Sequence, residues 1–94
     1  MLDLIGNTPL YQTQNIDVGQ NTLLLKMEHL NPGGSIKDRI AAAMLNKAEQ
    51  QGKLKPGGTI VEATVGNTGL ALAHIAAMRG YKTIIVMPDK VSEE

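Results

Sequence analysis

A lysine stands at a junction where its amine is placed to do chemistry. Lys37 follows two glycines, Gly33 and Gly34, and opens a stretch with helical spacing of apolar residues. An unprotonated amine attacks aldehydes, and burial or the positive end of a helix disfavours the ammonium form. We therefore interpret Lys37 as a candidate for covalent chemistry with an aldehyde. A surface lysine explains this motif equally well, because an exposed cation in a first helical turn lowers stability by only about 0.3–1 kcal/mol.

A second loop, residues 64–69, has the features of an anion site. It reads TVGNTG, follows an apolar run and precedes another helical pattern. Free backbone N–H groups and the helix dipole bind anions at such a junction. Gly66 lets the backbone approach a ligand, and Thr64, Asn67 and Thr68 add side-chain donors. A polar turn whose Asn and Thr merely cap the helix explains the same residues.

The elements that position the two loops alternate between strand and helix. Apolar runs with β-branched residues predict strands, and apolar residues at helical spacing predict helices. Such alternation indicates an α/β domain with mostly parallel strands. The expected elements are an extended segment at 10–13, a buried strand at 22–28, a helix from 35 to a turn at 53–58, a strand at 59–63, a helix from 67 or 68 to 79, a strand at 82–87 and a helix start at 92–94.

Local patterns predict details of the two helices. Ser35 followed by Asp38 matches a capping box in its Asp form. We interpret Asp38 and Arg39 as a capping interaction or a solvated helix face. Gly80 is expected to end the second helix. The apolar face of the first helix is expected at Ile36, Ile40, Ala43, Met44 and Ala48.

Composition argues against several classes of function. The chain has 94 residues, a formal net charge of zero, two Tyr as its aromatic residues and no Cys. The charges are not clustered and two aromatic residues do not make a stacking surface, so the sequence does not point to nucleic acid or a membrane as a partner. The lack of Cys excludes disulfides and thiolate metal sites, and no metal is expected. Neither glycine fingerprint of nucleotide binders is present. With no signal peptide visible, we expect a cytoplasmic protein.

Four short motifs occur in order along the chain. They are IGNTPL at 5–10, NPGGSIKDRI at 31–40, GNTG at 66–69 and MPDK at 87–90. Together they resemble the cysteine synthase / cystathionine β-synthase family, a branch of the fold type II pyridoxal-phosphate enzymes. The resemblance covers essentially the whole chain. It implies that residues 1–94 form the amino-terminal part of such an enzyme, with the start of its larger and smaller domains and an incomplete sheet.

The resemblance implies a role for each candidate residue. Lys37 matches the lysine that bonds covalently to pyridoxal 5'-phosphate and later moves protons at the substrate Cα. Asn67 matches the residue that hydrogen-bonds the ring hydroxyl of the cofactor. Thr64, Gly66, Asn67 and Thr68 match the loop that holds the α-carboxylate of an amino-acid substrate.

The implied activity is β-replacement on serine or O-acetylserine, of the cysteine synthase or cystathionine β-synthase type. The Cα proton leaves, the β-substituent is eliminated, and a thiol or sulfide adds. The residues do not encode whether sulfide or homocysteine is the acceptor. Full-length members are expected to form homodimers. Val65 replaces the usual Ser of the family, and a lost hydrogen bond to a charged carboxylate costs about 1.5–3 kcal/mol.

Length is the larger departure from the family. Its members are far longer, and their phosphate-binding loop and the residue at the pyridine nitrogen lie in a part that these 94 residues do not contain. We expect this chain by itself to be inactive or weakly active, and to associate through unpaired strand edges. The alternative is a non-catalytic module that associates with a full-length relative.

Overall fold

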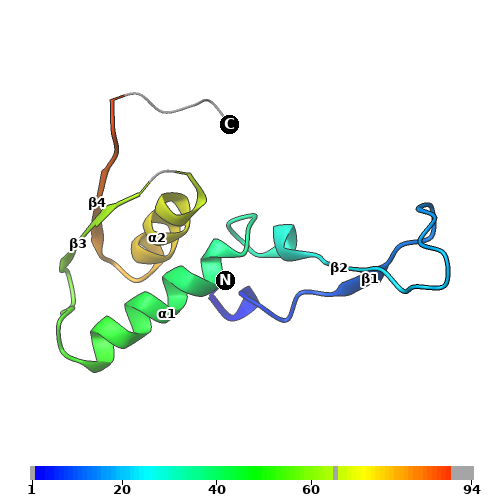
Figure 1. Cartoon of the computed structure of the whole chain (residues 1–94). Helices are drawn as coiled ribbons and strands as arrows, with labels where there is room; N and C mark the ends of the chain where they lie inside the picture. Colours follow the sequence, from blue (N-terminus) through cyan, green and yellow to red (C-terminus); the bar gives the residue numbers. More distant parts are fainter. Residues whose placement is uncertain (1, 65, 90–94) are drawn as a thin grey trace.

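Two helices and four short strands make up the described part of the chain, residues 2–64 and 66–89, in a computed structural model (Figure 1). Neither helix in that part is long and apolar enough to cross a membrane. The α/β class is confirmed, whereas the helix start expected at 92–94 lies outside the described residues. The elements are the 3-10 helices η1 (Leu2–Leu4) and η2 (Glu28–Leu30), the strands β1 (Leu10–Gln12), β2 (Leu24–Lys26), β3 (Thr59–Ala63) and β4 (Lys82–Val86), and the helices α1 (Lys37–Gln50) and α2 (Asn67–Met78).

The two strand pairs differ in direction. β3 and β4 are parallel and in register from Thr59 opposite Lys82 to Ala63 opposite Val86, with α2 as the crossover between them. β1 and β2 pair antiparallel and project away from the helices (Figure 1). The strand expected at 22–28 is present as β2, but its expected burial is wrong, because β2 lies in this projecting pair and all three of its residues are exposed.

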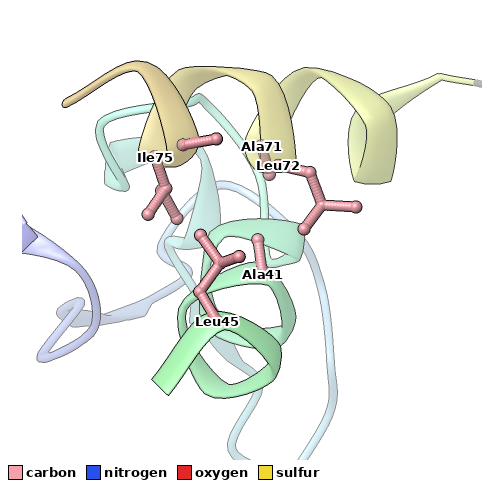
Figure 2. Close-up of a cluster of buried hydrophobic side chains, with 6 residues drawn as sticks. Ala41, Leu45, Ala71, Leu72 and Ile75 are labelled. Carbon is pink, nitrogen blue, oxygen red and sulfur yellow. The ribbon is translucent and has the colours of Figure 1, made fainter. Parts of the chain in front are cut away.

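The core lies between the two helices (Figure 2). The expected apolar face of α1 is wrong: Ile40 is 42% exposed and Met44 40%, whereas Ala41 is fully buried and Leu45 is 3% exposed. Both sets of residues have helical spacing, and the position of α2 decides which set is covered. The buried apolar residues are Ala41, Leu45, Ala71, Leu72, Ile75 and Ala76.

One face of the parallel sheet is apolar and exposed. Val61 is 61% exposed, Ile84 52% and Val86 51%. These residues alternate along β3 and β4 with half-buried ones, which follows from the two-residue period of a strand. Parallel sheets normally have both faces covered. The sheet is therefore incomplete in the described residues, as expected.

Candidate active site

The amino ends of α1 and α2 lie at the same end of the helix pair. Ala41 lies beside Ala71 and Leu72, and Leu45 lies beside Ile75 (Figure 2). Residue numbers thus increase in the same sense along both helices across this contact. The first turns of both helices lie ahead of it, on the same side.

Lys37 and Asn67 occupy equivalent places ahead of this contact. Lys37 is four residues before Ala41, and Asn67 is four residues before Ala71. Residues four apart in a helix lie on the same face, about one turn or roughly 6 Å apart along the axis. The predicted nucleophile and the predicted cofactor ligand therefore each lie one turn ahead of a buried alanine, on the faces where the helices meet.

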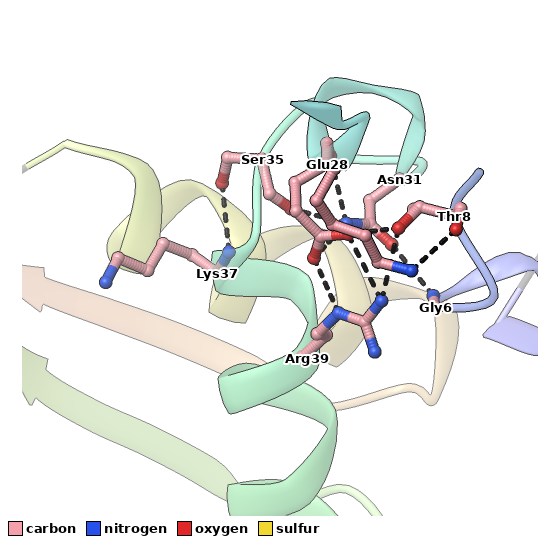
Figure 3. Close-up of polar contacts among 8 residues, drawn as sticks. Gly6, Thr8, Glu28, Asn31, Ser35, Lys37 and Arg39 are labelled. Carbon is pink, nitrogen blue, oxygen red and sulfur yellow. Dashed lines mark hydrogen bonds and ion pairs between the residues drawn. The ribbon is translucent and has the colours of Figure 1, made fainter. Parts of the chain in front are cut away.

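The Lys37 amine has no polar partner among the described residues. The side chain is half-buried and points away from the polar cluster around Arg39 (Figure 3). No hydrogen bond or ion pair with the described residues engages its Nζ. The backbone N–H of Lys37 is held, because it donates to Ser35 Oγ at 3.1 Å. The structure thus fixes the main chain at this position and leaves the amine without a partner in the part it describes.

The predicted capping box has a different partner. The Asp38 carboxylate accepts a hydrogen bond from the Gly33 N–H at 2.6 Å, whereas the box would require the Ser35 N–H. Asp38 is 1% exposed, so its interpretation as a solvated helix face is wrong. The glycine-rich turn folds back over the start of α1 and covers this carboxylate. A Cβ at position 33 would lie 2.2 Å from Asp38 Oδ1, which explains the glycine.

Arg39 joins a polar cluster that sequence reasoning did not find. Its Nε donates to Glu28 Oε1 at 2.5 Å and its Nη2 donates to Glu28 Oε2 at 3.1 Å. The Thr8 hydroxyl also donates to Glu28. These bonds, first that from Arg39 and then that from Thr8, lower the pKa of Glu28 from 4.5 to about 2. The three residues are far apart in sequence, and the occurrence of Thr8 and Arg39 in two of the motifs was the available signal.

The loop before α2 is built from glycine. Gly66 is the N-cap, with φ 73° and no side-chain cap hydrogen bond, so the expected capping by Asn67 or Thr68 is wrong. A positive φ is tolerated by glycine, and here it turns the chain into the helix. Asn67 is exposed and Thr68 half-buried, and neither side chain makes a hydrogen bond within the described residues. Their polar groups remain available to a ligand.

The remaining candidate, Thr64, follows the carboxyl end of β3. It is half-buried, and its N–H donates to the Val86 carbonyl at 3.1 Å. A Cβ at Gly69 would lie 3.0 Å from its methyl group and 3.4 Å from Ile85. The glycine thus lets α2 pack closely on the sheet beside Thr64. The departure at Val65 lies outside the described residues.

Comparisons with known proteins agree on one family. Residues 1–94 match the family described as pyridoxal-phosphate dependent enzyme. The chain is 51% identical over 92 residues to a cysteine synthase of Staphylococcus aureus, which covers 97% of this chain and 30% of the relative. It is 55% identical over 97 residues to the cystathionine beta-synthase of Apis mellifera, covering 100% of this chain and 19% of the relative.

A solved structure shows the same arrangement of elements. The hydrogen sulfide-producing enzyme of Fusobacterium nucleatum superimposes with a TM-score of 0.93 at 52% identity, over 97% of this chain and 30% of that one. The resemblance inferred from the motifs is confirmed, as is the likeness to the amino-terminal part of a fold type II enzyme. The chain spans about 30% of the length of the cysteine synthase described above.

Proposed function

This chain belongs to the family of pyridoxal-phosphate-dependent enzymes, and on that basis we propose that it carries the lysine and the carboxylate-binding loop of a β-replacement site. The donor substrate is serine or O-acetylserine, and the acceptor is a thiol or sulfide. The named relatives at 51% and 55% identity are a cysteine synthase and a cystathionine beta-synthase. The observation that carries the proposal is the placement of Lys37 and Asn67 one turn ahead of the same helix contact.

The residues present fit the aldehyde and ring hydroxyl of pyridoxal phosphate. Lys37 offers a half-buried amine that has no partner among the described residues, as a covalent link to an aldehyde requires. Asn67 offers an exposed amide at the first residue of α2. When bound, the cofactor supplies an electron sink for negative charge that develops at the substrate Cα.

The chain's own residues bind the substrate and move its proton. Lys37 Nζ takes the proton from the substrate Cα. The α-carboxylate binds at the first turn of α2, where backbone N–H groups are free and the helix dipole favours an anion. That turn contains no acidic residue. Gly66 gives the backbone access to the carboxylate, and Thr64 and Thr68 supply hydroxyl groups.

Labelling with pyridoxal phosphate tests this proposal. The chain is incubated with the cofactor, reduced with borohydride and mapped by mass spectrometry. We expect the adduct on Lys37, and we expect Lys37→Ala to lose it. Lys47→Ala is the matched control, since Lys47 is exposed in the last turn of the same helix. Equal labelling of all the lysines, or retention of the visible absorption band in Lys37→Ala, would contradict the proposal.

The exposed sheet face favours a second candidate, a non-catalytic module that associates with a full-length relative. Val61, Ile84 and Val86 present an apolar surface that an isolated chain leaves in water. Size-exclusion chromatography with the Staphylococcus aureus cysteine synthase tests this candidate. Co-elution that is lost in Ile84→Lys supports it. Separate elution of the two proteins, with no change in the activity of the synthase, counts against it.

Other expectations from the resemblance stay predictions. These are the homodimer of full-length members and the division of residues 1–94 between the start of a larger and a smaller domain. The cytoplasmic location, expected from the lack of a visible signal peptide, also stays a prediction.

A further inference from the structure

Asn31 is a buried amide that joins three segments of the chain. It is 3% exposed. Its Oδ1 accepts a hydrogen bond from the Gly6 N–H at 2.8 Å. Its Nδ2 donates to the carbonyls of Glu28 at 2.9 Å and Ser35 at 3.0 Å (Figure 3). Both ends of the amide are therefore used, as a buried polar group requires.

The bonds of Asn31 converge on the turn that leads to Lys37. Its backbone carbonyl accepts from the Gly34 N–H at 2.8 Å, and its side chain holds the Ser35 carbonyl. Ser35 Oγ in turn accepts from the N–H of Lys37. One residue thus fixes Gly34 and Ser35, which lie three and two residues before the start of α1. The path of the chain through this turn decides where the Lys37 side chain leaves the backbone.

We propose that Asn31 is a positioning residue for Lys37. It anchors the Ser35 carbonyl to the Gly6 loop and so sets the orientation from which the amine meets an aldehyde. Asn31 acts through Ser35, and nothing in the proposal places it against reacting atoms. The inference rests on the proposed function in that Lys37 is the reactive amine. Whether Asn31 orders the turn is a separate question, answered without the cofactor.

The substitution Asn31→Asp separates this role from the filling of space. Aspartate has nearly the same size and keeps an oxygen for the Gly6 N–H. It loses the NH2 group, so that a carboxylate oxygen faces the carbonyls of Ser35 and Glu28. Unpaired acceptors in a buried place repel each other and the turn must shift. The Glu28 carboxylate lies within reach of the same amide, with Oε1 at 3.4 Å from Nδ2, and adds to the repulsion.

The first measurement compares the rates of adduct formation at two lysines of one molecule. Wild type and Asn31→Asp are labelled with pyridoxal phosphate between pH 6 and 9, reduced and mapped, with Lys47 as the internal reference. We expect the Lys37-to-Lys47 ratio to fall about tenfold in Asn31→Asp and its pH profile to change, since one or two hydrogen bonds are lost. An unchanged ratio in folded Asn31→Asp overturns the inference.

A second substitution controls for stability alone. Glu49→Gln removes the ion pair with Arg79, whose Nη1–Oε1 distance is 2.5 Å, at a place remote from the turn. This variant is expected to lower the melting temperature and leave the labelling ratio unchanged. If the ratio falls equally in both variants, the effect is one of general stability and the positioning role is wrong.

Hydrogen exchange decides the ordering of the turn without the cofactor. In the cofactor-free chain, Asn31→Asp is expected to speed exchange at the amides of Gly34 and Lys37 at least about tenfold relative to α2 amides. Unchanged exchange overturns the inference whatever the cofactor does. If Asn31→Asp fails to fold, Ser35→Ala replaces it, with loss of the Lys37 amide protection and a lower labelling ratio as the expected result. A wild-type chain with protected amides but unselective labelling refutes the proposed function alone.

Discussion

The first turns of α1 and α2 lie at the same end of the helix pair but are built in opposite ways. Before α1, polar side chains already hold the backbone: Asn31 holds Ser35, Ser35 holds Lys37, and Asp38 holds Gly33. Before α2, a glycine with positive φ makes the turn, and as the N-cap residue Gly66 has no side chain that could bond the first N–H groups of the helix.

This difference fits the two separate tasks that we propose for these turns. A nucleophile works from a fixed direction, so its main chain must be held before any substrate arrives. A loop that receives an anion must keep its donors unsatisfied until the ligand supplies the acceptor. The exposed Asn67 and the bonded Ser35 are the contrasting cases. In the turn before α1, residues 31–38, the polar side chains are therefore already hydrogen-bonded to the backbone. In the first turn of α2, the side chain of Asn67 makes no hydrogen bond within the described residues.

The largest expected effect comes from disrupting the glycine-rich turn before α1 with Gly33→Ala. The new methyl group would lie 2.2 Å from Asp38 Oδ1, and the carboxylate is too buried to move away freely. We expect the free energy of unfolding to fall by about 3 kcal/mol, measured by urea denaturation. Ala43→Ser on the exposed side of α1 is the control, with a change within about 0.5 kcal/mol. Equal stability of the two variants would mean that the turn is not closely packed on Asp38.

The spacing of the two turns is tested by Ala41→Leu. Ala41 is fully buried where α1 meets α2, so a larger side chain must push the helices apart. We expect a loss of about 2 kcal/mol in stability and weaker labelling of Lys37, because its distance from Asn67 increases. Ala43→Leu on the same helix is exposed and serves as the matched control. Labelling that survives in folded Ala41→Leu would show that the two turns act independently.

The ion pair between Glu28 and Arg39 predicts that stability depends on pH in the acid range. The pKa of Glu28 is lowered from 4.5 to about 2, mainly by the hydrogen bond from Arg39. The stabilisation is therefore complete above about pH 4.5 and is lost as the pH falls towards 2. Melting temperatures between pH 2 and 6 should fall more steeply in wild type than in Glu28→Gln. Parallel curves for wild type and Glu28→Gln would exclude Glu28 as a source of this pH dependence. Glu49→Gln, which removes a different ion pair, is the control.

The smallest effect on stability is expected in the first turn of α2. Asn67→Ala removes a side chain that makes no hydrogen bond within the described residues, so stability should change by less than about 0.5 kcal/mol. Its labelling by pyridoxal phosphate should nevertheless weaken. Ser35→Ala, which loses the bond to the Lys37 N–H, should cost more, about 1 kcal/mol. Thermal melts of the two variants side by side test this order, and a larger loss in Asn67→Ala would reverse the comparison.

The sequence by itself determined the elements and the family. The strand at 59–63 and the end of α2 before Gly80 were predicted correctly, because β-branched runs and a glycine with positive φ are local signals. The four motifs indicated the family without any structure. Local chemistry also identified Lys37 and the loop at 64–69 as candidate sites, and their roles stay predictions.

Tertiary structure decided what local spacing leaves open. Helical periodicity fits the stripe of Ile40 and Met44 as well as that of Ala41 and Leu45, and the partner helix covers the second stripe. In the same way, the local pattern predicted that the carboxylate of Asp38 bonds the Ser35 N–H, whereas the fold of the glycine-rich turn brings the Gly33 N–H to it. Burial and hydrogen bonding depend on which segments meet in space, and that is set by packing between distant residues rather than by the sequence around each one.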